Sequence, residues 1–180
     1  MANAELAIFS LVAEQPRHGY EIEQVIEERG MREWTEIGFS SIYYLLKKLE
    51  KAGLVESQTM QVGQGPARKV YQITAAGGQA FHAGVIDALS VPRRCYPPIN
   101  LGLAGLPAVS LDQALAALRG YRDDLAGRLA QVRERWAGQR PLPYFVEAMF
   151  EYSTTLVEAE LAWVERFIKQ LEEKSAENRL

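Results

Sequence analysis

The spacing of hydrophobic residues predicts three helices in the first third of the chain. Residues 3–15 and 19–29 carry apolar side chains at intervals of three and four, the spacing of one helical face. In residues 38–52 the apolar positions fall within an arc of roughly 100°, the width of a core-facing stripe. These positions are Ile42, Leu45, Leu46 and Leu49. The third helix is therefore expected to have one buried side and one outward side.

Two strands and a fourth helix are expected next. Residues 54–61 and 68–73 have the residue types and alternation of strands, and Gly63-Gln64-Gly65-Pro66 between them predicts a turn. Thr74 is a suitable N-cap for a helix that runs to about Leu89. Three helices, two strands and a helix make a helix-turn-helix followed by a wing, the name used below for the hairpin of residues 54–73.

The second half of the chain predicts a helical hairpin. Two long segments repeat apolar residues with the alternating four- and three-residue spacing of coiled coils, and residues 138–143 break them apart. A hairpin of this length has more apolar surface than it can bury by itself, so a second copy of the chain is the expected cover. The predicted dimerisation residues are Leu111, Leu115, Leu118, Leu125, Leu129, Val132, Val157, Leu161, Val164, Ile168 and Leu171.

These patterns predict a mainly α fold with a small β-hairpin, in which an N-terminal winged helix-turn-helix is followed by a C-terminal α-helical hairpin that dimerises like a coiled coil. The expected domains are a DNA-binding domain at residues 1–90, a Pro-rich linker at 91–109, and a helical dimerisation and effector domain at 110–180.

The outward side of the third helix carries the chemistry of a DNA-reading surface. On the helical projection its centre holds Ser40, Tyr44, Lys47 and Lys51, with Ser41, Tyr43 and Lys48 on the flanks. The serines lie at the predicted helix start, where a hydroxyl can cap free backbone N–H groups. The wing adds Arg68 and Lys69, which strand alternation sends to opposite faces. Taken alone, such a helix is as readily a solvated surface helix; the wing behind it favours the DNA-reading interpretation.

The charge distribution supports a local cationic patch on an acidic protein. Between residues 40 and 70, Lys and Arg outnumber Asp and Glu five to two, whereas the whole chain carries a net charge of −3. Such a patch binds DNA by releasing counterions, and its binding weakens with salt. The chain is 48% hydrophobic and 24% charged, which is typical of a globular protein and excludes disorder or a collagen-like composition.

Several classes of function are not expected. Cys95 is the single cysteine, so an intrachain disulfide and a cysteine cluster for zinc are excluded. The sequence contains no phosphate-binding glycine loop, no His-Glu metal motif and no paired catalytic constellation, which predicts no enzymatic activity, no metal and no cofactor. The start of the sequence does not resemble a signal peptide, and no stretch approaches the ~18 apolar residues of a membrane span. A cytoplasmic protein without a membrane partner is therefore expected.

Two groups of residues leave alternatives open. His18-Gly19-Tyr20 is interpreted as structural, with a turn glycine, a histidine at a helix start and a tyrosine that packs the helices, rather than as an acid–base site. The aromatic residues Trp136, Tyr152 and Trp163 are interpreted first as packing residues and second as candidate contacts for a planar small-molecule effector, because flat rings bind planar ligands well.

The first 80 residues or so resemble the PadR family of bacterial transcriptional regulators. The resemblance rests on the order and spacing of short motifs, which are His18-Gly19-Tyr20-Glu21-Ile22, Ser41-Ile42-Tyr43, Leu46, Leu49-Glu50, Gly53-Leu54-Val55, Tyr71-Gln72-Ile73-Thr74 and Gly77. The C-terminal helices resemble, in layout, the longer type of PadR regulator, whose helical C-terminal region dimerises.

The resemblance implies where DNA would bind. In the family the third helix enters the major groove and the wing touches the flanking backbone or the minor groove. Carried over, this implies that Ser40, Ser41, Tyr43, Tyr44 and Lys47 contact double-stranded DNA and that Arg68 and Lys69 act from the wing. Tyr44 departs from the pattern, because family members often have proline directly after the helix-3 tyrosine; contacts at the helix start are therefore expected to differ.

The sequence thus predicts a dimeric, ligand-responsive repressor that reads a pseudo-palindromic operator. The alternative from another class is a winged-helix module that uses the same face to bind an acidic protein without specific DNA binding. Competition by random duplex DNA discriminates between the two hypotheses.

Overall fold

The computed structural model describes residues 2–35, 37–61 and 67–177 of the chain, without the side chains of residues 33, 39, 40, 175 and 177. Contacts divide the chain into two units, Met1–Arg94 and Cys95–Leu180. The expected turn at Gly63–Pro66 lies outside the described residues. Each unit has a hydrophobic core of its own, so each is considered by itself.

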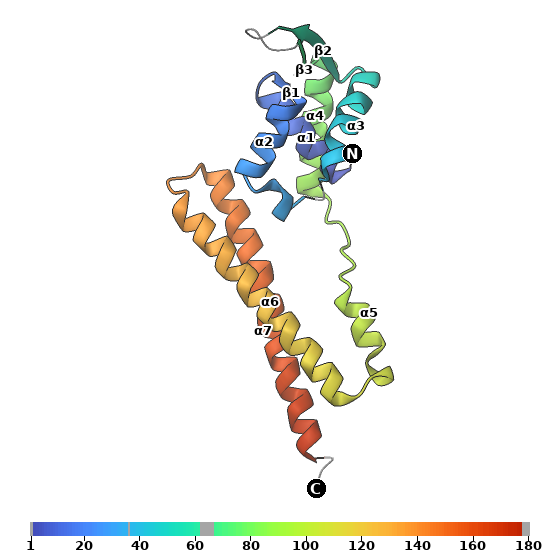
Figure 1. Cartoon of the computed structure of the whole chain (residues 1–180), viewed down its shortest axis with the longest axis vertical. Helices are drawn as coiled ribbons and strands as arrows, with labels where there is room; N and C mark the ends of the chain where they lie inside the picture. The colour runs from blue at the N-terminus through green and yellow to red at the C-terminus, as the bar shows by residue number, and fades with distance from the viewer. Residues whose placement is uncertain (1, 36, 62–66, 178–180) are drawn as a thin grey trace. The chain divides into compact units, whose positions relative to one another are not determined.

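The N-terminal unit has the expected element order with two short additions (Figure 1). Its elements are α1 (Asn3–Glu14), β1 (Arg17–His18), α2 (Gly19–Glu28), the 3₁₀ turn η1 (Met31–Glu33), α3 (Phe39–Lys51), β2 (Val55–Met60), β3 (Arg68–Ile73) and α4 (Ala75–Ser90). The prediction of a mainly α winged helix-turn-helix is confirmed, and α3 and β3 begin and end within a residue of the expected positions.

The apolar stripes of α1, α2 and α3 meet in one core. Ile8, Ile22 and Leu46 are fully buried there, and Ile42 and Leu49 are 1% exposed. Each of these residues belongs to the three- and four-residue spacing that predicted the helices, since that spacing places them on one face. Burial of a large aliphatic side chain stabilises a fold by about 1.5–3 kcal/mol, so the convergence of three stripes holds α3 firmly against α1 and α2.

The sheet has one strand more than predicted. Its order is β1-β3-β2, with both pairs antiparallel. The wing hairpin aligns Ser57 with Tyr71, and β1 adds Arg17 opposite Tyr71 on the other edge of β3. The expectation of a two-stranded hairpin is corrected here, because β1 has two residues and is too short for alternation to reveal it. The pairing ties the start of α2 directly to the wing.

Gly77 permits a close approach between α4 and the end of the third helix. Thr74 caps α4 as predicted, since its Oγ1 accepts a hydrogen bond from the Gly77 N–H at 3.0 Å. The Thr74 N–H donates to the Leu54 carbonyl at 3.1 Å, and the Thr74 hydroxyl donates to the Gly53 carbonyl at 2.8 Å. A Cβ at Gly77 would lie 1.9 Å from the Leu54 carbonyl oxygen. Gly53, which has a φ of 71°, ends α3 in the left-handed region that favours glycine.

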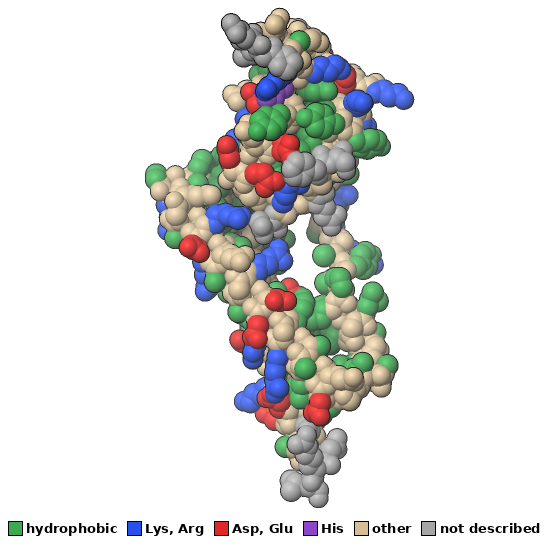
Figure 2. Space-filling model, viewed as in Figure 1, with side chains coloured by type: hydrophobic (Ala, Val, Ile, Leu, Met, Phe, Trp, Pro, Cys, Tyr) green, Lys and Arg blue, Asp and Glu red, His purple; other side chains and the backbone are tan. Residues whose placement is uncertain are grey.

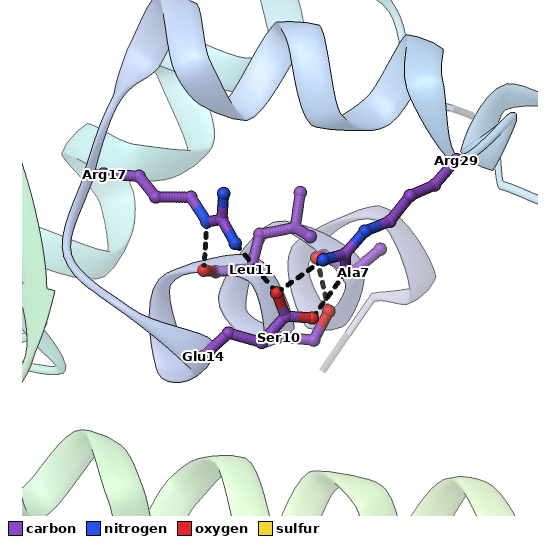
Figure 3. A network of polar contacts seen from close by, with 6 residues as sticks. All are labelled: Ala7, Ser10, Leu11, Glu14, Arg17 and Arg29. Carbon is purple, nitrogen blue, oxygen red and sulfur yellow. Dashed lines mark hydrogen bonds and ion pairs between the residues drawn. The ribbon is translucent and has the colours of Figure 1, made fainter. Parts of the chain in front are cut away.

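Two arginines fasten the end of α1 to the flanks of α2 (Figure 3). Arg29, which follows α2, donates to both carboxylate oxygens of Glu14 at 2.6 and 2.9 Å. Arg17 donates to Glu14 at 2.9 Å and to the Leu11 carbonyl at 3.0 Å. These contacts hold the pKa of Glu14 below its ordinary value, chiefly through the hydrogen bonds from Arg29.

The C-terminal unit consists of a short helix and a long helical hairpin. Its elements are α5 (Ile99–Ala104), the 3₁₀ turn η2 (Leu106–Ala108), α6 (Leu111–Gly138) and α7 (Tyr144–Glu177). α5 begins after Pro98, within the segment predicted as a Pro-rich linker, because proline is well tolerated at a helix start. The predicted break at residues 138–143 separates α6 from α7.

Ion pairs and a buried seam hold α6 and α7 antiparallel, as expected (Figure 1). Arg119 pairs with Glu172 at 2.6 Å, and Arg133 pairs with Glu158 at 2.7 Å. Tyr121 donates a hydrogen bond to Glu160 at 2.5 Å. Burial, and then this hydrogen bond, raise the pKa of Tyr121 to about 12.

Candidate nucleic-acid interface

The outward face of α3 is exposed, as the helical projection predicts. Tyr43 and Tyr44 are 51% and 66% exposed, and Lys47 and Lys51 also lie at the surface. The helix start differs from the expectation, because Gly38 is the N-cap and makes no side-chain hydrogen bond. Ser41 therefore lies within the first turn and is half-buried, while the Ser40 side chain lies outside the described residues. The predicted serine cap is thus corrected.

The five cations predicted for this surface fall into two groups. Lys48 pairs with Glu5 of α1 at 3.1 Å, and Lys69 pairs with Glu50 at 3.0 Å. In the described part of the chain, no ion pair is formed by Lys47, Lys51 or Arg68. A cation already paired with a carboxylate gains less from a phosphate, so these three cations are the ones best placed to bind an anion.

Glu50 joins α3 to the wing. Its carboxylate accepts hydrogen bonds from the Ser57 hydroxyl of β2 and from Lys69 Nζ of β3, the latter at 3.0 Å to each oxygen. The hydrogen bond from Ser57, and then that from Lys69, hold the pKa of Glu50 below its ordinary value. The same contact raises the pKa of Lys69. The result is a fixed angle between the helix and the two strands behind it.

A groove of about 520 Å³ lies between the start of α2, the start of α3 and β3. His18, Tyr20, Tyr43, Arg68 and Tyr71 line it, so rings and cations from three elements face one space. Figure 2 shows hydrophobic side chains beside Lys and Arg at the end of the N-terminal unit that carries α3 and the sheet.

Gly19 sets the position of one wall of this groove. A Cβ at Gly19 would lie 2.4 Å from Cε1 of Tyr43, so glycine allows the ring to lie flat against the first turn of α2. Tyr20, which was expected to pack the helices together, is instead 54% exposed. All three residues of the motif His18-Gly19-Tyr20 line this groove. Because the motif was interpreted as structural, the sequence did not predict these residues at a surface site.

The predicted dimerisation residues are engaged within one chain. Leu115, Leu125, Val157 and Val164 belong to the core between α6 and α7, and Val164 is fully buried. Leu118, Leu129, Ile168 and Leu171 share that core, Leu111 and Leu161 pack against it, and Val132 is half-buried. These residues therefore have little surface to give to a second copy.

A second stripe on α7 remains exposed. Phe145, Met149, Tyr152 and Leu156 repeat with four- and three-residue spacing, and they are 57%, 39%, 68% and 52% exposed. At ~100° per residue this stripe lies about 120° around the helix from the buried one. α7 thus carries two apolar stripes, and the predicted dimerisation residues of α7 form the internal one.

The three candidate ligand residues do not come together within one chain. Trp136 stacks on Phe150 with ring centroids 5.9 Å apart and donates to Glu147 at 2.5 Å. Trp163 stacks on Phe167 at 5.2 Å. Tyr152 and Trp163 lie eleven residues apart on α7, which is roughly 16 Å of helix. A ligand could therefore contact more than one of these rings only between two copies of the chain. Within one chain, a ligand site would form around a single ring.

The described residues offer neither a metal site nor a membrane span. They contain no group of three or more His, Cys, Asp or Glu side chains that could hold a metal ion. None of their helices is both long enough and apolar enough to cross a bilayer.

The N-terminal unit matches a known family. Residues 8–83 match the Transcriptional regulator PadR-like family. A curated relative from Lysinibacillus sphaericus is 36% identical over 70 residues, which are 39% of this chain and 63% of that protein. The match thus spans less than two thirds of the relative.

Solved structures match nearly the whole chain in fold. Bacillus subtilis PadR in complex with operator DNA has a TM-score of 0.77 at 20% identity, covering 93% of this chain and 98% of that chain. The same protein with p-coumaric acid has a TM-score of 0.77 at 19% identity, with the same coverage. A PadR-like regulator from Bacillus cereus has a TM-score of 0.71 at 16% identity, covering 96% and 99%. Residues 8–83 are thus similar to the PadR-like family of transcriptional regulators, and the chain has the fold of the solved PadR structures.

Proposed function

We propose that the protein is a sequence-specific DNA-binding transcriptional regulator that reads duplex DNA with α3 and the wing. The observation that carries the proposal is the division of α3 into a buried apolar side and an exposed side, which holds two tyrosines and also Lys47 and Lys51, neither of which pairs with a carboxylate of the described residues. A helix of this size fits a major groove, with tyrosines toward the bases and lysines near phosphates. The matching fold of the Bacillus subtilis protein in complex with operator DNA supports the proposal.

Selection from a random duplex pool, followed by gel shift across salt concentrations, tests this function. We expect one enriched sequence with two half-sites about one helical turn or a multiple apart, bound less tightly as salt rises. Lys47→Ala should weaken binding and lower the salt slope by about 0.9, the value for one phosphate contact. Lys169→Ala, a surface lysine of α7, is the matched control and should leave binding unchanged. Failure to enrich any duplex, or complete competition by random DNA, would contradict specific recognition.

We further propose that the protein acts as a homodimer through the exposed stripe of α7. Four large apolar side chains cover this face, and on the helical projection its near neighbours over residues 145–159 are alanines rather than charged residues. Exposed patches of this kind, rich in aromatics and depleted of charge, are typical of interface cores. A second copy fits because the same stripe meets itself across a two-fold axis, and two-fold symmetry matches a pseudo-palindromic operator.

Sedimentation equilibrium on stripe variants tests the homodimer. Met149→Glu with Leu156→Glu places charges on the exposed stripe and should give a monomer with unchanged helix content. Gln131→Glu on the exposed side of α6 is the control and should remain dimeric. A monomeric parent protein, or a double variant that still dimerises, would refute this surface.

The repressor activity and its release by a small molecule complete the proposal. In the C-terminal unit, the Trp136 ring stacks on Phe150, and the Arg140 guanidinium carbon lies 4.9 Å from the centroid of the Trp136 ring. Aromatic rings with a cation nearby suit a planar anion, and p-coumaric acid is bound to the Bacillus subtilis protein of the same fold. Adding p-coumaric acid should quench indole fluorescence and release the selected duplex, and Trp136→Phe should weaken both effects. If adding p-coumaric acid leaves the indole fluorescence unchanged, compounds of this class are excluded as effectors.

A further inference from the structure

One histidine of the groove faces an arginine, so that two donors lie close together. His18 Nδ1 accepts a hydrogen bond from the Glu21 N–H at 3.1 Å, because His18 is the N-cap of α2. A neutral imidazole that accepts at Nδ1 carries its proton on Nε2. Nε2 lies 3.2 Å from Arg68 Nη1, which is also a donor. Two N–H groups from different elements therefore point into the same part of the groove.

The Glu21 carboxylate lies near these donors, but its shorter contact is in the helix cap. Glu21 Oε2 accepts a hydrogen bond from the His18 backbone N–H at 2.9 Å, as part of the same helix cap. Its other oxygen lies 3.4 Å from His18 Nε2. Arg68 forms no ion pair with any described carboxylate, so its charge is available to a ligand. An oxyanion between the two donors would accept a hydrogen bond from each, and charge-assisted bonds of this kind are the strong ones.

We propose that this groove seats a phosphate of the DNA backbone between His18 Nε2 and the Arg68 guanidinium. The rings of Tyr20 and Tyr43 form flat walls on which the adjoining deoxyribose can pack, since each ring is about half exposed. The inference rests on the proposed DNA binding and adds a third contact element, the start of α2, to α3 and the wing. Because β1 pairs His18 with Val70 of β3, two residues from Arg68, the histidine and the arginine are held near each other and the seat exists before DNA arrives.

The variants that test the seat preserve the fold. His18→Asn keeps a side-chain oxygen to cap α2, because asparagine is among the best N-cap residues, but it removes the Nε2 donor. Arg68→Gln removes the charge from an exposed strand position. Tyr20→Ala removes one wall at an exposed position. Circular dichroism and thermal unfolding should match the parent protein for all three variants.

The measurement is binding to the duplex selected above, in full-length protein. We expect His18→Asn and Tyr20→Ala each to weaken binding about 5- to 50-fold, and Arg68→Gln to lower the salt slope by about 0.9 as well. The double variant of His18 and Arg68 should lose less than the product of the two effects, because both contact one phosphate. A duplex with a neutral methylphosphonate at that phosphate should bind the parent protein more weakly and the double variant unchanged.

The outcomes separate this inference from the proposed function. If the parent protein binds the selected duplex and the variants bind it equally well, the seat is overturned while DNA binding stands. Equal sensitivity of parent and double variant to every methylphosphonate position would overturn it too, since the residues would then act only through the fold. If the parent protein binds no duplex, both proposals fail.

Discussion

Replacing Gly77 with alanine is expected to destabilise the N-terminal unit, whereas the same change at Gly78 is expected to stabilise it. A Cβ at Gly77 would lie 1.9 Å from the Leu54 carbonyl oxygen and 2.8 Å from Ile73 Cγ1, and the first of these is backbone that cannot rotate away. At Gly78 a Cβ would meet nothing within 4 Å. Both residues lie in the first turns of α4, so helix propensity contributes equally to the two variants.

Three effects determine how much Gly77→Ala lowers the free energy of unfolding. Overpacking against fixed backbone costs about 1–3 kcal/mol. Displacing α4 weakens the two hydrogen bonds that Thr74 donates to the Leu54 and Gly53 carbonyls, for about 1–2 kcal/mol together. The higher helix propensity of alanine offsets up to about 1 kcal/mol. The expected net loss for Gly77→Ala is therefore about 1–4 kcal/mol, against a gain of about 0.5–1 kcal/mol for Gly78→Ala.

Urea unfolding followed by Trp34 fluorescence measures both variants. The chain has three tryptophans, and Trp136→Phe with Trp163→Phe leaves Trp34 as the single indole, within the N-terminal unit. If the free energy of unfolding of Gly77→Ala stays within about 0.5 kcal/mol of the parent value, the close approach of α4 to Leu54 is refuted, since surface changes have effects of that size.

Three further predictions concern single side chains. Glu14→Gln should cost about 1 kcal/mol at neutral pH, after allowance for solvent screening. The pKa of Glu14 is lowered chiefly by Arg29, so the parent protein should lose this stability as pH falls below about 4.5 and the variant should not, as urea midpoints across pH would test. The pKa of Tyr121 is raised to about 12 by burial and Glu160, so parent stability should fall as pH rises from about 10 to 12, a loss that Tyr121→Phe should remove. Tyr44→Ala should leave stability within about 0.5 kcal/mol yet weaken binding to the selected duplex at least tenfold, and unchanged gel-shift affinity would contradict its place at the centre of the interface.

Helical periodicity predicted the N-terminal fold well, because the same residues that define the spacing fill the core. Ile42, Leu46 and Leu49 were assigned to a buried face from spacing alone, and all three are buried. Thr74 was assigned as a cap from its residue type and position, and its hydroxyl makes the expected hydrogen bond. Spacing along the sequence is enough to predict the buried side of a helix where the helix packs through a single apolar stripe of its own.

The features that spacing could not predict depend on partners distant in sequence. β1 becomes a strand only because β3 is beside it, and Arg68 meets His18 across fifty residues. For α7, periodicity predicted the stripe that packs against α6 but assigned it to a second copy of the chain, and the exposed stripe was not predicted. Val157 and Tyr152 both fit a four- and three-residue repeat, and only the packed structure separates them.

In the proposed homodimer, the two stripes of α7 allow folding and association to vary separately. Since the internal stripe is satisfied by α6, substitutions at Phe145, Met149, Tyr152 and Leu156 leave the hairpin core intact. A second protein with the same fold but a different exposed stripe would then pair poorly with this chain. Substitutions at these four surface positions would therefore change the choice of partner while the scaffold stays the same.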